Sequence, residues 1–216
     1  MEREAPNERS GWERNGRTES ERNRGTDAGP NAAADRETEP VERRVGQLLR
    51  DRGETVAVAE SLTGGRVADL LTDVPGASDY FDRGFVTYAY DAKREELAVP
   101  REVLDEHGAV SEPVARAMAR GVRDVADVTW GVAATGIAGP SGGTAEKPVG
   151  LVYLGVAYAA PWGSEESFAR VNRRVFDGDR QAVKSASARG ALSTLEAAIE
   201  ATPSRANGDG SDATDG

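Results

Sequence analysis

The residue types best suited to chemistry gather in one short stretch of the sequence, AESLTGG at residues 59–65. It contains a carboxylate, two hydroxyls and two adjacent glycines: Glu60, Ser61, Thr63, Gly64 and Gly65. The stretch follows an apolar run, TVAVA, and precedes RVADLL, which has helical spacing. A hydroxyl at such a strand-to-helix turn serves either as a nucleophile or as the N-cap of the following helix, and the glycines could also cradle a phosphate.

A serine nucleophile needs a base, and the sequence narrows the choice of base. There is no cysteine, and the single histidine, His107, stands in a loop-like stretch, where we interpret it as structural. Lys93, in TYAYDAK, is one of three lysines in a chain that otherwise uses arginine, and a buried lysine can lose its proton near neutral pH. Tyr88 would relay the proton or orient the lysine. The alternatives are a surface lysine at a helix start and a tyrosine that only packs on a strand.

Two further segments carry groups suited to binding an anion. The loop 135–150 contains five glycines, at positions 136, 139, 142, 143 and 150, but it matches neither the P-loop nor the dinucleotide-binding pattern. It is either a binding loop that presents backbone N–H groups or a lid. In FDGDR, Asp179 is placed to cap the last helix, and Arg180 is placed to clamp a phosphate or a carboxylate.

The elements that must position these segments follow from the apolar spacing. Strands are predicted at residues 55–59, 84–90, 128–134, 151–159 and 167–176. Helices are predicted from residue 41 to near 53, from 66 to before 74, from 91 to before 100, from 111 to about 125 and from 178 to 201. This alternation predicts a single three-layer α/β/α domain, and the adjacent last two strands make the central sheet mixed. AESLTGG, TYAYDAK and TGIAGPSGG all follow strands, so we expect them to converge at the carboxyl edge of the sheet.

The two ends of the chain differ in composition from its middle. Of the 216 residues, the first 40 hold ten acids, seven arginines and no Val, Ile, Leu, Phe or Tyr. Residues 203–216 are similarly polar. We predict disordered tails at 1–40 and 203–216, with one folded domain at 41–202.

The composition also excludes several classes of function. A net charge of −10 argues against a nucleic acid partner, and no apolar stretch approaches the length of about 20 residues that a membrane span needs. Without cysteines or a histidine cluster, neither a disulfide nor a thiolate or histidine metal site is expected, and carboxylates are left as the possible metal ligands. We therefore expect a cytoplasmic protein, and the acid-rich, lysine-poor composition resembles that of proteins from salt-loving archaea.

Four runs together resemble the C-terminal domain of the CinA (competence/damage-inducible) family. They are AESLTGGRVADLLTDVPGASDYFDRGFVTYAYDAK, HGAVSEPVARAMA, ATGIAGPSGGTAEKPVG and FDGDRQAV. They stand in the family's order and cover nearly all of 41–202. Stand-alone, PncC-like members of this family are nicotinamide-nucleotide amidohydrolases. The resemblance implies deamidation of nicotinamide mononucleotide to nicotinate mononucleotide and ammonia, in pyridine nucleotide salvage, with neither cofactor nor metal.

The resemblance also assigns roles to residues. Ser61 is the implied nucleophile of an acyl-enzyme mechanism, with Tyr88 and Lys93 as its activating partners. Arg180 is implied to hold the nucleotide phosphate. Backbone N–H groups near Gly64 and Gly65, or in the glycine loop, would bind the oxyanion. The expected substrate-binding residues are Thr63, Gly64, Gly65, Thr135, Gly136, Gly139, Gly142, Gly143 and Arg180, with Thr63 also left to cap the helix.

The sequence departs from the family pattern at three places near these residues. Leu62 stands where the family more often has cysteine, and Ala89 and Tyr90 replace the Ser and Asn of the usual VTYSNEAK. Loss of two small polar groups beside Lys93 leaves a second hypothesis open, a non-catalytic nucleotide-binding or regulatory module. A DNA-associated role fits the acidic domain poorly. The family's habit of assembly implies a homo-oligomer.

Overall fold

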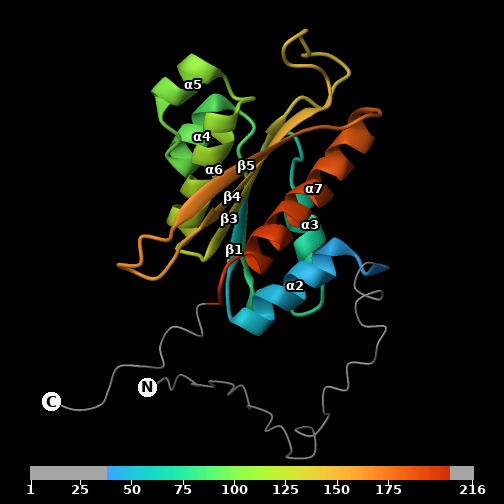
Figure 1. Cartoon of the computed structure of the whole chain (residues 1–216). Coiled ribbons are helices and arrows are strands. Elements are labelled where there is room, and N and C mark those ends of the chain that lie inside the picture. The colour runs from blue at the N-terminus through green and yellow to red at the C-terminus, as the bar shows by residue number, and fades with distance from the viewer. Residues whose placement is uncertain (1–37, 205–216) are drawn as a thin grey trace, which may run out of the picture. The chain divides into compact units, whose positions relative to one another are not determined.

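The centre of the protein is a five-stranded sheet with the strand order β2-β1-β3-β4-β5 (Figure 1). The computed structural model describes residues 38–204. The strands are β1 (Val56–Glu60), β2 (Phe81–Val86), β3 (Trp130–Gly136), β4 (Leu151–Tyr158) and β5 (Phe168–Val175). The first three strands are parallel, whereas β4 pairs antiparallel with both β3 and β5. The predicted mixed sheet with a late hairpin is therefore confirmed.

Helices cover both faces of this sheet, which gives the predicted three layers (Figure 1). On one face lie α2 (Val41–Arg52), α3 (Arg66–Thr72) and α7 (Arg180–Glu200). On the other lie α4 (Tyr90–Leu97), α5 (Arg101–His107) and α6 (Glu112–Ala126). A short 3₁₀ turn, η2 (Ala77–Asp79), leads into β2. A separate hydrophobic core fills the space on each face.

The two faces of the sheet differ in the size of their side chains. In β1, Val56 and Val58 point toward α2 and α7, whereas Ala57 and Ala59 point toward α6. The face toward α6 also includes glycines in β3 and β4, so α6 can lie very close to the sheet. A Cβ atom on Gly131 would stand 2.1 Å from the carbonyl oxygen of Ala119 in α6. The small residues therefore set the distance between α6 and the sheet.

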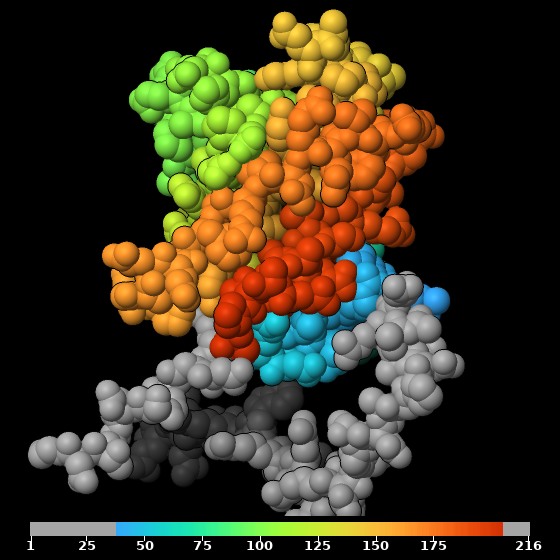
Figure 2. Space-filling model, in the orientation of Figure 1, coloured from blue at the N-terminus to red at the C-terminus, as the bar shows by residue number. Residues whose placement is uncertain are grey.

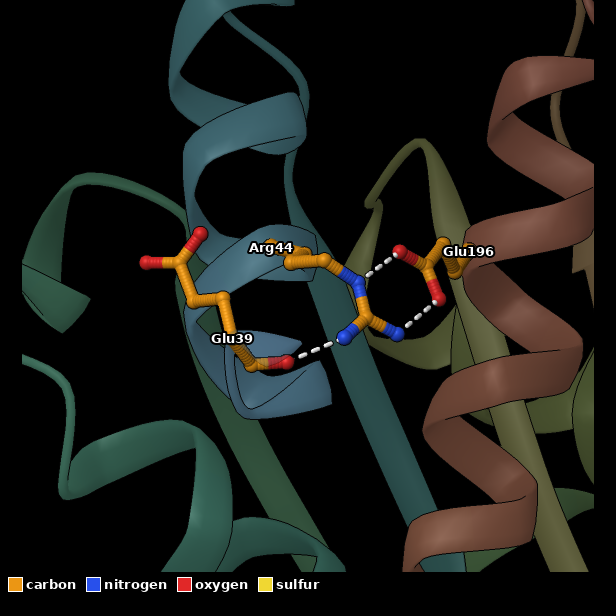
Figure 3. A network of polar contacts seen from close by, with 3 residues as sticks. All are labelled: Glu39, Arg44 and Glu196. Carbon is orange, nitrogen blue, oxygen red and sulfur yellow. Dashed lines mark hydrogen bonds and ion pairs between the residues drawn. The ribbon is translucent and has the colours of Figure 1, made fainter. Parts of the chain in front are cut away.

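On the opposite face, α7 lies against α2 (Figure 2). Arg44 of α2 donates two hydrogen bonds to the carboxylate of Glu196 in α7, at 2.6 and 2.8 Å (Figure 3). A third bond runs from the same guanidinium to the carbonyl oxygen of Glu39, just before α2. Because this bidentate pair is mostly shielded from solvent, it fixes the contact between the two helices more firmly than an exposed ion pair would.

The structure corrects the limits of one predicted strand and the surroundings predicted for His107. The strand predicted at 84–90 is wrong at both ends: β2 spans 81–86, and Tyr90 already begins α4. The strand β2 lies at the edge of the sheet and pairs only with β1. Because β1 ends at Glu60, whose partner is Val86, β2 ends at Val86 as well. His107 does not lie in a loop; it is the last residue of α5, which the sequence reading missed.

The missed helix starts directly after Pro100, which was expected to end a helix. Pro100 stands at the N-cap of α5, where a missing N–H costs nothing. The predicted tails fall outside the described residues, apart from 38–40 and 203–204. Among the helices described within 38–204, none combines the length and the apolar character needed to cross a membrane.

Candidate active site

The candidate site lies where the three parallel strands end. Ser61 directly follows β1, the segment 87–89 follows β2, and the glycine loop follows β3. Two backbone hydrogen bonds continue the sheet past β1. The N–H of Ser61 donates to Ala134 at 2.9 Å, and the N–H of Thr87 donates to Glu60 at 2.8 Å. The predicted convergence of these loops is confirmed. The backbone at Ser61 is held between β3 on one side and the segment after β2 on the other.

Ser61 and Lys93 form a direct pair at this edge. The Lys93 Nζ lies 3.2 Å from the Ser61 Oγ, within hydrogen-bonding distance. The same Nζ donates to the carbonyl oxygens of Thr87, at 2.6 Å, and Tyr88, at 3.4 Å. A neutral amine has two N–H donors and one lone pair. With both donors directed at the carbonyl oxygens, the lone pair is left to face the serine hydroxyl.

Lys93 is fully buried, with an exposed fraction of 0%. Burial disfavours its charged form and lowers the pKa of Lys93 from 10.5 to about 8. At pH 7 roughly a tenth of Lys93 is therefore neutral, far more than for a lysine in water, and this neutral form is the one that a general base requires. The alternative interpretation of Lys93 as a surface lysine is wrong.

Glu60 organises the turn that carries Ser61. Its carboxylate is buried and accepts hydrogen bonds from the N–H groups of Gly65 and Ala68, each at 2.9 Å. These are N–H groups of the first turn of α3, so Glu60 takes the capping role that was predicted for Thr63. The Thr63 prediction is wrong because Gly65, with a φ of 95°, forms the N-cap and the Thr63 side chain is turned into the interior. Within residues 38–204, the Thr63 hydroxyl has no hydrogen-bond partner.

Arg180 joins the glycine loop to the segment after β2. Its guanidinium donates to the carbonyl oxygen of Gly139, at 2.7 Å, and to the hydroxyl of Tyr88, at 3.2 Å. The Tyr88 side chain is largely exposed and points to Arg180, so within residues 38–204 no hydrogen bond joins its hydroxyl to Ser61 or Lys93. Tyr88 therefore contacts Lys93 through its main chain and Arg180 through its side chain. Asp179 caps α7 as predicted, accepting from the N–H of Ala182 at 2.8 Å.

A second set of contacts fixes the turn between α5 and α6 against the site. The Thr135 hydroxyl donates to the carbonyl oxygen of Ala109 at 2.7 Å, and Tyr90 accepts from the N–H of Ala109 at 3.0 Å. Lys147, in the glycine loop, donates to the carbonyl oxygen of His107 at 3.0 Å. Tyr90 thus has a defined structural role, and Thr135 uses its hydroxyl for a bond within the protein.

The glycines expected to bind substrate differ in their surroundings, because some are packed in the sheet and others are exposed in the loop. Gly136 is the last residue of β3 and packs against β4, where a Cβ atom would lie 2.5 Å from a carbonyl oxygen. Gly142 and Gly143 are exposed further along the loop. The N–H groups of Ser61 and Gly65 already have partners, whereas those of residues 62–64 have none among the described residues and can bind a ligand. Among the described residues, no group of three or more histidine or acidic side chains is placed to hold a metal ion.

The roles of two residues near the site were not predicted from the sequence. One is Glu60, for which the sequence predicts no role. The other is Lys184 of α7, whose Nζ lies 3.2 Å from the position that a Cβ atom on Gly64 would occupy. The signal that pointed to Lys93, a lysine in an arginine-rich chain, applied equally to Lys184.

The fold and the site define an α/β protein with a serine–lysine pair at the carboxyl edge of a mixed sheet. The family model of the CinA C-terminal domain matches residues 38–199, and the chain belongs to this family. A CinA-like protein from Anaeromyxobacter sp. (strain K) is 54% identical over 151 residues, which are 70% of this chain and 35% of that protein. One from Synechocystis sp. is 58% identical over 113 residues, covering 52% of this chain and 27% of that protein. The matched part of the chain thus spans between about a quarter and about a third of the length of these curated relatives.

Solved structures of the family share the fold. The competence/damage inducible protein CihA from Agrobacterium tumefaciens is 41% identical, with a TM-score of 0.68, and the match covers 74% of this chain and 93% of that one. The competence damage-inducible protein A from Klebsiella pneumoniae is 31% identical, with a TM-score of 0.70, over 76% of this chain and 97% of that one. Both matches cover nearly the whole of the compared chain, so the likeness extends over the complete fold.

Proposed function

We propose that this protein hydrolyses the carboxamide of nicotinamide mononucleotide and releases nicotinate mononucleotide and ammonia, as a cytoplasmic enzyme of pyridine nucleotide salvage. The observation that carries the proposal is the contact between Ser61 and the fully buried Lys93, whose lowered pKa supplies a base. A serine–lysine pair performs acyl transfer without histidine, cysteine or metal. The family membership supports the same chemistry.

In the first half of the proposed reaction, neutral Lys93 accepts the proton of the Ser61 hydroxyl. The serine oxygen then forms a bond to the carboxamide carbon, and the carbonyl oxygen becomes an oxyanion held by N–H groups of residues 62–64. When the carbon–nitrogen bond breaks, the Lys93 ammonium returns its proton to the departing nitrogen. Ammonia leaves, and the nicotinate group is bound to Ser61 as an ester.

In the second half, a water molecule takes the place of ammonia. Lys93, neutral again, accepts a proton from this water as the water oxygen bonds to the ester carbon. The bond to the Ser61 oxygen breaks, and the serine oxygen recovers a proton from Lys93. Nicotinate mononucleotide leaves, and the enzyme has returned to its starting state.

The test is ammonia release from nicotinamide mononucleotide by purified protein, measured at low and at high potassium chloride. Ser61→Ala is expected to reduce kcat by at least about 1,000-fold, because the nucleophile is lost. Ser164→Ala is the matched control, since Ser164 lies in the exposed β4–β5 connection and contacts only that turn. Folded wild-type protein that releases no ammonia would refute the amidase.

A second candidate, a nucleotide-binding or regulatory module, is motivated by Tyr90. Its hydroxyl is committed to the turn between α5 and α6, at a position where the family usually has a small polar residue. Calorimetry that detects tight nucleotide binding without any hydrolysis would favour this module. The proposal also includes a homo-oligomer, which light scattering of the purified protein would test.

A further inference from the structure

Three cationic side chains meet at the rim of the candidate site. Arg180 and Lys184 are four residues apart on α7 and so lie on the same face of this helix. Arg66, at the start of α3, is held beside them by hydrogen bonds to the carbonyl oxygen of Thr63, at 3.1 Å, and to the side chain of Gln181, at 2.5 Å. We call Arg66, Arg180 and Lys184 the rim cations.

No ion pair with an acidic side chain neutralises the rim cations in the part of the chain that the structure describes. Within residues 38–204, none of the three forms an ion pair with a carboxylate, and their hydrogen bonds go to carbonyl oxygens, a phenol and an amide. Glu60 is the carboxylate that acts on Lys184, and both of its oxygens already accept backbone N–H groups. The chain has 37 acidic and 27 basic residues, so three cations grouped without an ion pair are unusual in it. Such a group creates a local positive potential that would attract an anionic ligand.

The three charges also act on one another. The pKa of Lys184 is lowered by partial burial and by the positive charges of Arg66 and Arg180, whereas Tyr88 and Glu60 act in the opposite direction. The cations are therefore held together against their mutual repulsion by the packing of α3 and α7. A bound dianion would relieve that repulsion, whereas a neutral ligand would leave it in place.

We propose that Arg66 and Lys184 act with Arg180 to recognise a phosphate monoester, and that they select nucleotides over the corresponding nucleosides. The inference rests on the proposed function and adds Arg66 and Lys184 as specificity-determining residues. A phosphate monoester matches the cluster because it carries close to two negative charges and three acceptor oxygens.

Tyr88 contacts both the rim cations and the serine–lysine pair. Tyr88 reaches Lys93 with its carbonyl oxygen and Arg180 with its hydroxyl, so one tyrosine residue separates the two groups. In nicotinamide mononucleotide, one ribose separates the carboxamide-bearing ring from the phosphate. In the proposed arrangement the substrate lies along Tyr88, with its carboxamide at Ser61 and its phosphate at the rim cations.

The test compares nicotinamide mononucleotide with nicotinamide riboside, which lacks the phosphate, in Lys184→Met and Arg66→Met. Each substitution is expected to raise KM for the nucleotide about 10- to 100-fold and to leave kcat within about twofold. Values of kcat/KM for the riboside should not change. Lys184→Arg, which keeps the charge, should restore the nucleotide KM. Arg189→Met, at an exposed position on the same helix, is the matched control.

Binding is measured separately by calorimetry in a Ser61→Ala background, with inorganic phosphate and with the nucleotide. Lys184→Met in this background should weaken the binding of both about 10-fold or more. The proposal is overturned if nucleotide affinity is unchanged, or if the nucleotide and the riboside lose kcat/KM equally. Should the wild-type protein release no ammonia, the amidase proposal fails, while the calorimetry still decides whether the rim cations bind phosphate.

Discussion

Replacing Lys93 by methionine should change how stability depends on pH. Below about pH 8 the folded protein holds a buried ammonium, whereas the unfolded chain holds the same group in water. The pKa of Lys93 falls from 10.5 to about 8 on folding, which corresponds to about 3 kcal/mol. This cost is fully present below pH 8 and disappears as pH rises to 10.5, because the unfolded lysine keeps its proton over that interval and the folded one does not.

Methionine has a similar length and no charge, so it removes this titration. It also leaves the carbonyl oxygen of Thr87 without its donor, which costs about 1–3 kcal/mol at every pH. The absolute stability of Lys93→Met at neutral pH is therefore a small difference between two opposed effects. The change with pH has one origin: relative to the variant, the wild type should gain about 3 kcal/mol between pH 7 and pH 10.5.

The assay is urea denaturation of both proteins at intervals between pH 7 and pH 10.5, followed by circular dichroism. Groups that titrate in both proteins cancel in the difference. Arg189→Met is a suitable control, because an arginine side chain stays protonated throughout this range and its replacement should give a constant offset. A wild-type to Lys93→Met difference that is flat within about 1 kcal/mol would refute the burial of a lysine with a lowered pKa.

Three further outcomes are expected. The rate of acyl-enzyme formation should rise about tenfold per pH unit up to about pH 8 and then level off, because Lys93 must be neutral to accept the serine proton; a rate independent of pH between 6 and 8 would contradict this. Glu60→Gln should destabilise the protein by about 1–3 kcal/mol and lower kcat, because an amide nitrogen would then face a backbone N–H; unchanged unfolding and activity would show that the turn does not depend on the carboxylate. Gly131→Ala should cost more than about 2 kcal/mol in urea denaturation, because its Cβ would stand 2.1 Å from the Ala119 oxygen, whereas Gly163→Ala, with no atom near its Cβ position but a positive φ, should cost about 1 kcal/mol.

The order of elements and the meeting of three loops could be predicted because both depend on local pattern. Apolar spacing defines strands and helices, and the carboxyl ends of parallel strands share one edge. The limits of β2 could not be predicted, since they depend on the length of β1, its one partner in the sheet. GFVTYAY has a strand-like composition, but pairing ends at Val86 and the remaining residues turn toward Lys93.

Within the candidate site, the type of a residue was a better guide to its role than its position in the motif. Lysine stood out against arginine, and the chemistry of a neutral amine pointed to burial, which the structure confirms for Lys93. Thr63 is the more usual capping residue, yet Glu60 caps α3. Which of these side chains reaches the helix depends on how the chain turns at Gly65, and that turn is a property of the folded backbone. The grouping of Arg66 with Lys184 likewise depends on how α3 packs against α7.

The division of the protein into two hydrophobic cores has a consequence for its motions. Lys93 belongs to the layer of α4, α5 and α6, whereas the rim cations belong to the layer of α3 and α7, and the sheet lies between these cores. Layers with separate cores can open separately, as cooperative units with their own free energies. A nucleotide that touches both layers would be lost when either one opens, so its binding free energy opposes both openings. Hydrogen exchange in α4 and in α7 would then slow together upon nucleotide binding, although no direct contact between these two helices is needed.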